Sequence, residues 1–249
     1  MSIPSSDIAV PPRVLALAGG AHLTPLWQNA MGGVTFRTDD ARVIKVGPRN
    51  PETTMAAEAE RLRWAGRYTP VPEVLDVGEE TREEAREDPG EEWLVTRALP
   101  GRSAVDPRWL GEPAVAVRAV GEGLRALHDA LPVADCPFDW SVPARITGAA
   151  ARGIQVPSAL RTPPPIDLAV VCHGDACVPN TLLGDDGRWI AHVDLGALGV
   201  ADRWGDIAVA AMSTEWNYGP GWHDALIAAY GVDPDRERLS YYRDLWNAT

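Results

Sequence analysis

Three polar residues have the types and the spacing needed to transfer a phosphoryl group. Asp175 lies in a His-Gly-Asp run, Asn180 follows it five residues later, and Asp194 begins an Asp-Leu-Gly run fourteen residues after Asn180. A phosphoryl group in transfer carries charge on several oxygens, so the protein must hold divalent cations with oxygen ligands and place a base beside the acceptor hydroxyl. The sequence therefore predicts Asp175 as the catalytic base and Asn180 and Asp194 as Mg²⁺ ligands.

The order of these residues is typical of kinase active sites. The kinase pattern is H-R-D-x-x-x-x-N followed by D-F-G, and here Gly174 stands for the arginine and Leu195 for the phenylalanine. The alternative is that the two aspartates cap turns and that Asn180 is an ordinary turn residue. Six matching residues in order favour the catalytic interpretation. His173 is expected to support the loop by hydrogen-bonding its backbone.

Short elements are expected to position these side chains. The apolar stretch Leu168–Cys172 predicts a strand that leads into the loop. Thr181–Leu183 and Trp189–Val193 are expected to form a hairpin across the turn Asp185–Gly187. This hairpin would bring the two predicted metal ligands to the same place.

A second polar pair is predicted upstream. Lys45 lies in the β-branched run Ala41–Val46, which matches the kinase strand whose lysine binds the α- and β-phosphates. The following helix, from Thr53 to Trp64, offers Glu58 or Glu60 as its partner, and these lie about 200° apart on a helix. Glu58 is expected to face Lys45 because it lies near the apolar face. The alternative is a solvated lysine and a solvated glutamate.

The sequence signals for the phosphate loop and the adenine contact are weaker. Gly32 and Gly33 form a turn between two expected strands, without a G-x-G-x-x-G pattern, and no P-loop sequence occurs. The backbone from Thr96 to Ala98 is expected to contact the base, which leaves ATP and GTP as alternatives. The stretch Glu79–Glu92 is expected to be an exposed connection without a function.

The chain resembles the aminoglycoside phosphotransferase family over nearly its whole length. The resemblance rests on the H-G-D, P-N and D-L-G runs, on Gly199–Arg203 and Asp206–Ala208, and on Leu99–Arg102 and Leu127–His128. It is strongest to the branch that phosphorylates kanamycin- and neomycin-like drugs. It implies a two-lobed α+β fold like that of protein kinases, use of ATP or GTP with Mg²⁺, and inactivation of an antibiotic. It also implies that Asp206 supports the catalytic loop.

Two departures from the family pattern concern the nucleotide and the acceptor. Ala197 stands where the family usually has an arginine that reaches toward the phosphates. The stretch Ser141–Pro165 is proline-rich and contains no Asp or Glu, whereas family members use an acidic helical insertion there to bind drug ammonium groups. Glu215, Trp216 and Tyr218 are therefore possible acceptor contacts, unless the aromatic residues belong to the core of the lobe.

Composition and charge narrow the function classes. The chain has 249 residues, 45% of them hydrophobic, and a net charge of −12, which disfavours binding to nucleic acid. Its three cysteines show no paired spacing, and no membrane span or export signal is expected, so we expect reduced thiols and a cytoplasmic protein. We expect a monomer or weak homodimer with a nucleotide-binding lobe (1–98) and a mainly helical catalytic and substrate-binding lobe (99–249).

Three functions are compatible with these features. The first is phosphorylation of an aminoglycoside. The second is a kinase of the same fold that acts on a nucleoside or peptide antibiotic or on another hydroxyl metabolite. The third, a catalytically silent nucleotide-binding protein, is motivated by Ala197 alone.

Overall fold

The computed structural model describes residues 8–29, 31–50, 53–80 and 90–249. Most of the expected connection 79–92 lies outside the described residues. Two compact units are present, one of residues 1–66 and 72–99 and one of residues 67–71 and 100–249. The predicted division into functional lobes of residues 1–98 and 99–249 stays a prediction.

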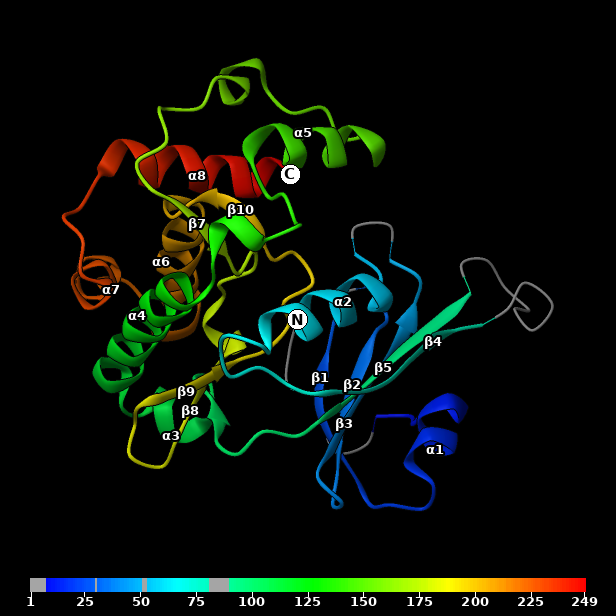
Figure 1. Ribbon diagram of the computed structural model, residues 1–249. Helices are drawn as coiled ribbons and strands as arrows, with labels where there is room; N and C mark the ends of the chain where they lie inside the picture. Colours follow the sequence, from blue (N-terminus) through cyan, green and yellow to red (C-terminus); the bar gives the residue numbers. More distant parts are fainter. Residues whose placement is uncertain (1–7, 30, 51–52, 81–89) are drawn as a thin grey trace. The chain divides into compact units, whose positions relative to one another are not determined.

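The first unit is built on one antiparallel sheet (Figure 1). Its strands lie in the order β1-β2-β3-β5-β4. The strands are β1 (Leu23–Gln28), β2 (Val34–Thr38), β3 (Arg42–Pro48), β4 (Val74–Glu79) and β5 (Glu91–Arg97). Alternation along β2 and β3 directs Val34, Phe36, Ile44 and Val46 to one face, where they form a core with Val14 and Ala18 of α1 (Pro12–Ala18).

Helix α2 (Met55–Ala65) packs against β4 and β5. Thr54 caps its first turn by accepting a hydrogen bond from the amide of Ala57. Its buried residues include Met55, Leu62 and Ala65, the apolar face that the sequence predicted.

The second unit is mainly helical (Figure 1). Its helices are α3 (Pro107–Leu110), α4 (Pro113–Ala130), α5 (Val142–Ala151), α6 (Trp204–Tyr218), α7 (His223–Tyr230) and α8 (Arg236–Ala248). Helix α6 is buried without interruption from Trp204 to Thr214, so it forms the centre of this unit. Helices α4 and α7 approach closely at Gly121, where a Cβ would lie 2.7 Å from that of Ala229.

Two small antiparallel sheets complete the second unit. One pairs β7 (Ala169–Cys172) with β10 (Gly199–Asp202), and the other has the order β6-β8-β9, where β6 is Arg102–Ser103. Strands β8 (Thr181–Leu183) and β9 (Trp189–His192) form the predicted hairpin, with Thr181 opposite His192. The sheet-rich first part and the helical second part confirm the predicted fold class.

One helix has no counterpart in the sequence prediction. Helix α5 was not among the elements expected from the sequence, and it lies in the proline-rich stretch Ser141–Pro165. Pro143 occupies its first turn, where a proline is tolerated, and the Ser141 side chain accepts a hydrogen bond from the amide of Ala144. Among the described helices, none is both long and apolar enough to cross a membrane.

Candidate active site

Strand β7 and the β8–β9 hairpin place the predicted catalytic residues side by side. The Asn180 side-chain amide donates to the backbone oxygen of Asp175 at 3.0 Å and to its Oδ2 at 3.1 Å. At the base of the hairpin, the amide of Val193 donates to the oxygen of Asn180 at 3.0 Å. Asn180 and Val193, the residue before Asp194, therefore lie side by side at the open end of the hairpin, and Asn180 also contacts Asp175.

The Asp175 carboxylate is electrostatically unsatisfied. Its Oδ1 is enclosed and has no hydrogen-bond partner among the residues that the structure describes. Burial, and then the nearby charge of Asp194, raise the pKa of Asp175. Two neighbouring carboxylates repel each other, so a cation beside them would be favoured.

Asp194 has a backbone conformation that is unusual for a residue with a side chain. Its φ is +62°, in the left-handed region. Such strain is typical of residues whose side chain must be aimed at a particular point. The Asp194 carboxylate and the Asn180 amide oxygen, which neither hydrogen bond to Asp175 uses, are oxygen ligands of the kind that Mg²⁺ prefers.

His173 connects the catalytic loop to the segment before Asp194. Its Nδ1 accepts a hydrogen bond from the amide of Asp175 at 3.2 Å, and its Nε2 lies 3.0 Å from the oxygen of Val193. Because Nδ1 accepts, Nε2 carries the proton and donates. His173 thus bridges backbone groups, the supporting role that the sequence indicated.

Asp206 holds the backbone of the same loop from helix α6. Its Oδ2 accepts from the amide of His173 at 2.6 Å and its Oδ1 accepts from the amide of Gly174 at 3.0 Å. Burial by itself would raise the pKa of Asp206, but the hydrogen bonds from the His128 side chain and from the backbone of His173 help to outweigh it, and the pKa is lowered. The carboxylate is therefore ionised and acts only as an acceptor.

Gly174 explains why the kinase arginine is absent from this loop. Its φ is +85°, and a Cβ at this position would lie 2.2 Å from the backbone oxygen of Ala197. The loop and the segment after Asp194 are in such close contact that only glycine fits.

In the first unit, Lys45 and Glu58 form the predicted pair. Lys45 Nζ lies 2.7 Å from Glu58 Oε2, and Glu58 is only 5% exposed, while Glu60 is on the exposed side of α2. The phase of the helix thus selected the correct glutamate. A role of this pair in binding nucleotide phosphates stays a prediction.

The other predicted nucleotide contacts also lie in the first unit. Gly32 has a φ of +86° in the turn between β1 and β2, and the amide of Gly33 donates to Asn29 Oδ1 at 2.7 Å. Thr96 lies within β5, and the amide of Ala98 donates to the oxygen of Ala41 at 2.8 Å. Recognition of adenine by Ala98 would therefore use its carbonyl oxygen.

The possible acceptor residues lie at the end of α6. Trp216 is 59% exposed, Glu215 pairs with His223 at 3.2 Å, and the Tyr218 hydroxyl donates to the oxygen of Ala104 at 2.7 Å. Trp204, another aromatic residue of α6, is buried in the core. Trp216 is therefore the most exposed of these aromatic side chains, and Tyr218 is partly exposed.

The sequence did not single out His128 of α4 as a functional residue. His128 Nε2 lies 2.9 Å from Asp206 Oδ2, and its Nδ1 lies 2.8 Å from the hydroxyl of Tyr230. These partners are 78 and 102 residues away in the chain, so no local pattern could indicate the contact. The Leu127–His128 match to the family was the one available signal.

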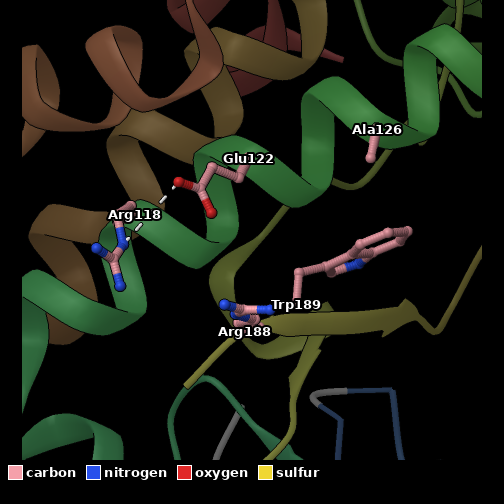
Figure 2. Close-up of a pocket in the computed structure, with 5 residues that line it drawn as sticks. All are labelled: Arg118, Glu122, Ala126, Arg188 and Trp189. Carbon is pink, nitrogen blue, oxygen red and sulfur yellow. Dashed lines mark ion pairs between the residues drawn. The ribbon is translucent and has the colours of Figure 1, made fainter. Parts of the chain in front are cut away.

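An open groove of about 540 Å³ lies between α4 and the start of β9. Figure 2 shows the side chains that line it, which are those of Arg118, Glu122, Ala126, Arg188 and Trp189. It contains none of the predicted site residues. Arg118 and Glu122 are 4.0 Å apart and exposed, so their attraction contributes little.

All three cysteines are free, as predicted. Burial raises the pKa of the Cys172 and Cys177 thiols, so both stay protonated. Neither thiol is in the reactive thiolate form beside the catalytic loop.

Comparison with known proteins identifies the class to which this fold and site belong. The model of the phosphotransferase enzyme family matches residues 23–242. The aminoglycoside 3'-phosphotransferase of Streptomyces fradiae is 36% identical over 231 residues, covering 80% of this chain and 82% of that protein. The streptomycin 3''-kinase of Streptomyces griseus is 34% identical over 249 residues, covering 86% and 87%.

The solved structures agree. The aminoglycoside phosphotransferase APH(3'')-Id of Streptomyces rimosus, in complex with ADP and streptomycin, matches with a TM-score of 0.67 and 26% identity, covering 93% of this chain and 94% of that one. The chain belongs to the aminoglycoside phosphotransferase family. It is a small-molecule kinase, and the resemblance seen in the sequence and the kinase-like fold are confirmed.

Proposed function

We propose that this protein transfers the terminal phosphoryl group of ATP or GTP, with Mg²⁺, to a hydroxyl of an aminoglycoside antibiotic and so inactivates the drug. The observation that carries the proposal is the enclosed, unpartnered Oδ1 of Asp175 beside Asn180 and the Asp194 charge. This arrangement lacks only a cation and a hydroxyl donor to be satisfied. Phosphoryl transfer to an antibiotic is further supported by relatives that are named for their aminoglycoside substrates.

Each residue has a separate task in this proposal. Asp175 orients the acceptor hydroxyl and takes its proton, which is the role of a positioned carboxylate in phosphoryl transfer. Asn180 and Asp194 hold Mg²⁺, which supplies positive charge to the phosphate oxygens when bound. Lys45, kept in place by Glu58, binds the α- and β-phosphates.

The remaining contacts follow the two-lobe organisation. We assign residues 1–98 to nucleotide binding, with Gly32 and Gly33 near the phosphates and Thr96 and Ala98 near the base. Residues 99–249 carry catalysis and the acceptor contacts Glu215, Trp216 and Tyr218. A cytoplasmic enzyme that is monomeric or weakly dimeric belongs to the same proposal.

A second acceptor class has its own support. The stretch Ser141–Pro165, which contains α5, has no carboxylate, and Arg145 of α5 is half-buried with its guanidinium 4.5 Å from the ring of Trp140. A stretch without carboxylates offers no ion-pair partner to a molecule with several ammonium groups. It favours the alternative of a less charged hydroxyl compound, such as a nucleoside or peptide antibiotic.

A phosphorylation screen tests both acceptor classes. The purified protein is incubated with labelled ATP or GTP, with and without Mg²⁺, and with aminoglycosides, nucleoside antibiotics or cyclic peptides. Transfer to an aminoglycoside that is lost in the Asp175→Asn variant supports the first proposal. Transfer only to a less charged acceptor supports the second acceptor class instead. Equal transfer by wild type and variant contradicts the role of Asp175.

A further inference from the structure

A buried tyrosine lies at the far end of the contacts that hold the catalytic loop. Tyr230, the last residue of α7, is 2% exposed, and its hydroxyl lies 2.8 Å from Nδ1 of His128. Their rings meet edge to face, with centroids 5.5 Å apart and an interplanar angle of 70°. His128 lies between this hydroxyl and Asp206, and Asp206 contacts the backbone of the catalytic loop.

The chemistry of Asp206 sets the direction of the first hydrogen bond. This ionised carboxylate can only accept, so His128 Nε2, 2.9 Å from Oδ2, must carry the proton and donate. The Tyr230 hydroxyl can both donate and accept, so it can pair with Nδ1 on the other side of the ring. Burial raises the pKa of Tyr230, so the hydroxyl keeps its proton and remains available as a donor.

The surrounding groups do not replace this donor. Arg125 lies over the ring of Tyr230, with Cζ 5.9 Å from the centroid, so it contacts the face and not the hydroxyl. The Cys172 thiol donates to the oxygen of Asp202 at 3.5 Å. His128, Cys172 and Asp206 lie within 4.8 Å of one another at their ligand atoms, but hydrogen bonds within the protein already occupy these atoms.

We propose that Tyr230 is a positioning residue for the catalytic loop: its hydroxyl holds the ring of His128 in the orientation from which Nε2 donates to Asp206, and Asp206 in turn fixes the amides of His173 and Gly174, next to Asp175. The inference rests on the proposed role of Asp175. Without the hydroxyl, the buried Nδ1 loses its partner, and the ring is held at one nitrogen only. The donor to the carboxylate that holds the loop is then less firmly placed.

Tyr230→Phe is the direct test, because it removes one hydroxyl and keeps the ring. Tyr241→Phe is the matched control, since it removes a hydroxyl that donates to the oxygen of Leu160 at 2.7 Å, far from Asp206 in the network. We expect Tyr230→Phe to lower kcat roughly fivefold to tenfold, the effect of one hydrogen bond on a positioned group. The KM values for nucleotide and acceptor should stay within about twofold, because no substrate contact is removed.

A spectroscopic measurement is independent of activity. The protein has five histidines, so the imidazole ¹⁵N signal of His128 can be assigned by its loss in His128→Gln. Tyr230→Phe should shift the Nδ1 signal, because this nitrogen loses its hydrogen-bond partner, and it should also shift the backbone amide signals of His173 and Gly174, which Asp206 holds. Unchanged amide signals in Tyr230→Phe overturn the proposal even if Asp175 proves to have no catalytic role.

A double-mutant cycle separates positioning from general loss of stability. If Tyr230 acts through His128, adding Tyr230→Phe to His128→Gln should leave kcat unchanged relative to His128→Gln alone. Independent, additive losses contradict the proposal. So does a fall in kcat for Tyr241→Phe as large as that for Tyr230→Phe.

Discussion

Replacing Asp175 by asparagine should make the protein more stable and nearly inactive. The change keeps the shape of the side chain but removes a charge that is buried and repelled by Asp194. The new amide nitrogen can take the place of Oδ1, which has no partner among the described residues, and the remaining oxygen can still accept from Asn180. Removal of the buried charge therefore favours the folded state, while the hydrogen bond from Asn180 is kept.

The substitution is expected to lower kcat and to raise the free energy of unfolding. Loss of a positioned base lowers kcat by roughly two to four powers of ten. Relief of an electrostatically strained active site typically raises the free energy of unfolding by about 0.5–2 kcal/mol. For a chain of this size, 1 kcal/mol corresponds to a rise in Tm of roughly 2–4 °C.

Steady-state kinetics and thermal unfolding of the same preparations test both effects. Asp185→Asn is the matched control, because that aspartate lies in the exposed hairpin turn, where its side chain is 85% exposed. Its kcat and Tm should be close to wild type. A Tm for Asp175→Asn below that of wild type would refute the argument from buried repulsion, and retained turnover would remove Asp175 from the catalytic role.

Four further outcomes are expected. Asp194→Ala should abolish Mg²⁺-dependent nucleotide binding in calorimetry, because it removes a charged oxygen ligand, and unchanged affinity would contradict this. Ala197→Arg should improve nucleotide use in steady-state kinetics by sharing phosphate charge, whereas lost activity would show a pocket shaped around the small residue. Asp206→Asn should destabilise the protein by about 2–4 kcal/mol at neutral pH, since a buried acceptor of three donors is replaced by a group that also donates. Because the pKa of Asp206 is lowered in the fold, this difference should shrink in urea titrations as pH falls below its ordinary value of 3.8. Binding of a neomycin-like drug should be modest and weakly dependent on salt, and tight, salt-sensitive binding unaffected by Trp216→Ala would return the acceptor site to a multi-carboxylate type.

Local spacing predicted the parts of the site that neighbouring elements build. The β8–β9 hairpin was visible in its turn residues and strand lengths, and it fixed the position of Asn180. Helical phase alone distinguished Glu58 from Glu60, because only one face of α2 is buried. In each case a period or a turn in the sequence carries the geometry.

The parts that could not be predicted depend on residues far apart in the chain. Tyr230, His128 and Asp206 come from three helices, and nothing in the sequence of any one helix indicates its partners. The positive φ of Asp194 is imposed by the surrounding fold and goes against the preference of the residue. Helix α5 was missed because prolines usually end helices, whereas Pro143 lies where a helix can begin.

The contact at Gly174 has an evolutionary consequence. The atom that a Cβ would meet, 2.2 Å away, is a backbone oxygen, which every amino acid at position 197 would also carry. No second mutation at that site can make room, so lineages that lose this glycine have no simple compensatory path. At Gly78, by contrast, the obstructing atoms belong to the side chain of Trp93, and a smaller residue there would relieve the clash. In a library of variants selected for drug resistance, position 174 should be intolerant in every background, whereas tolerance at position 78 should show epistasis with position 93.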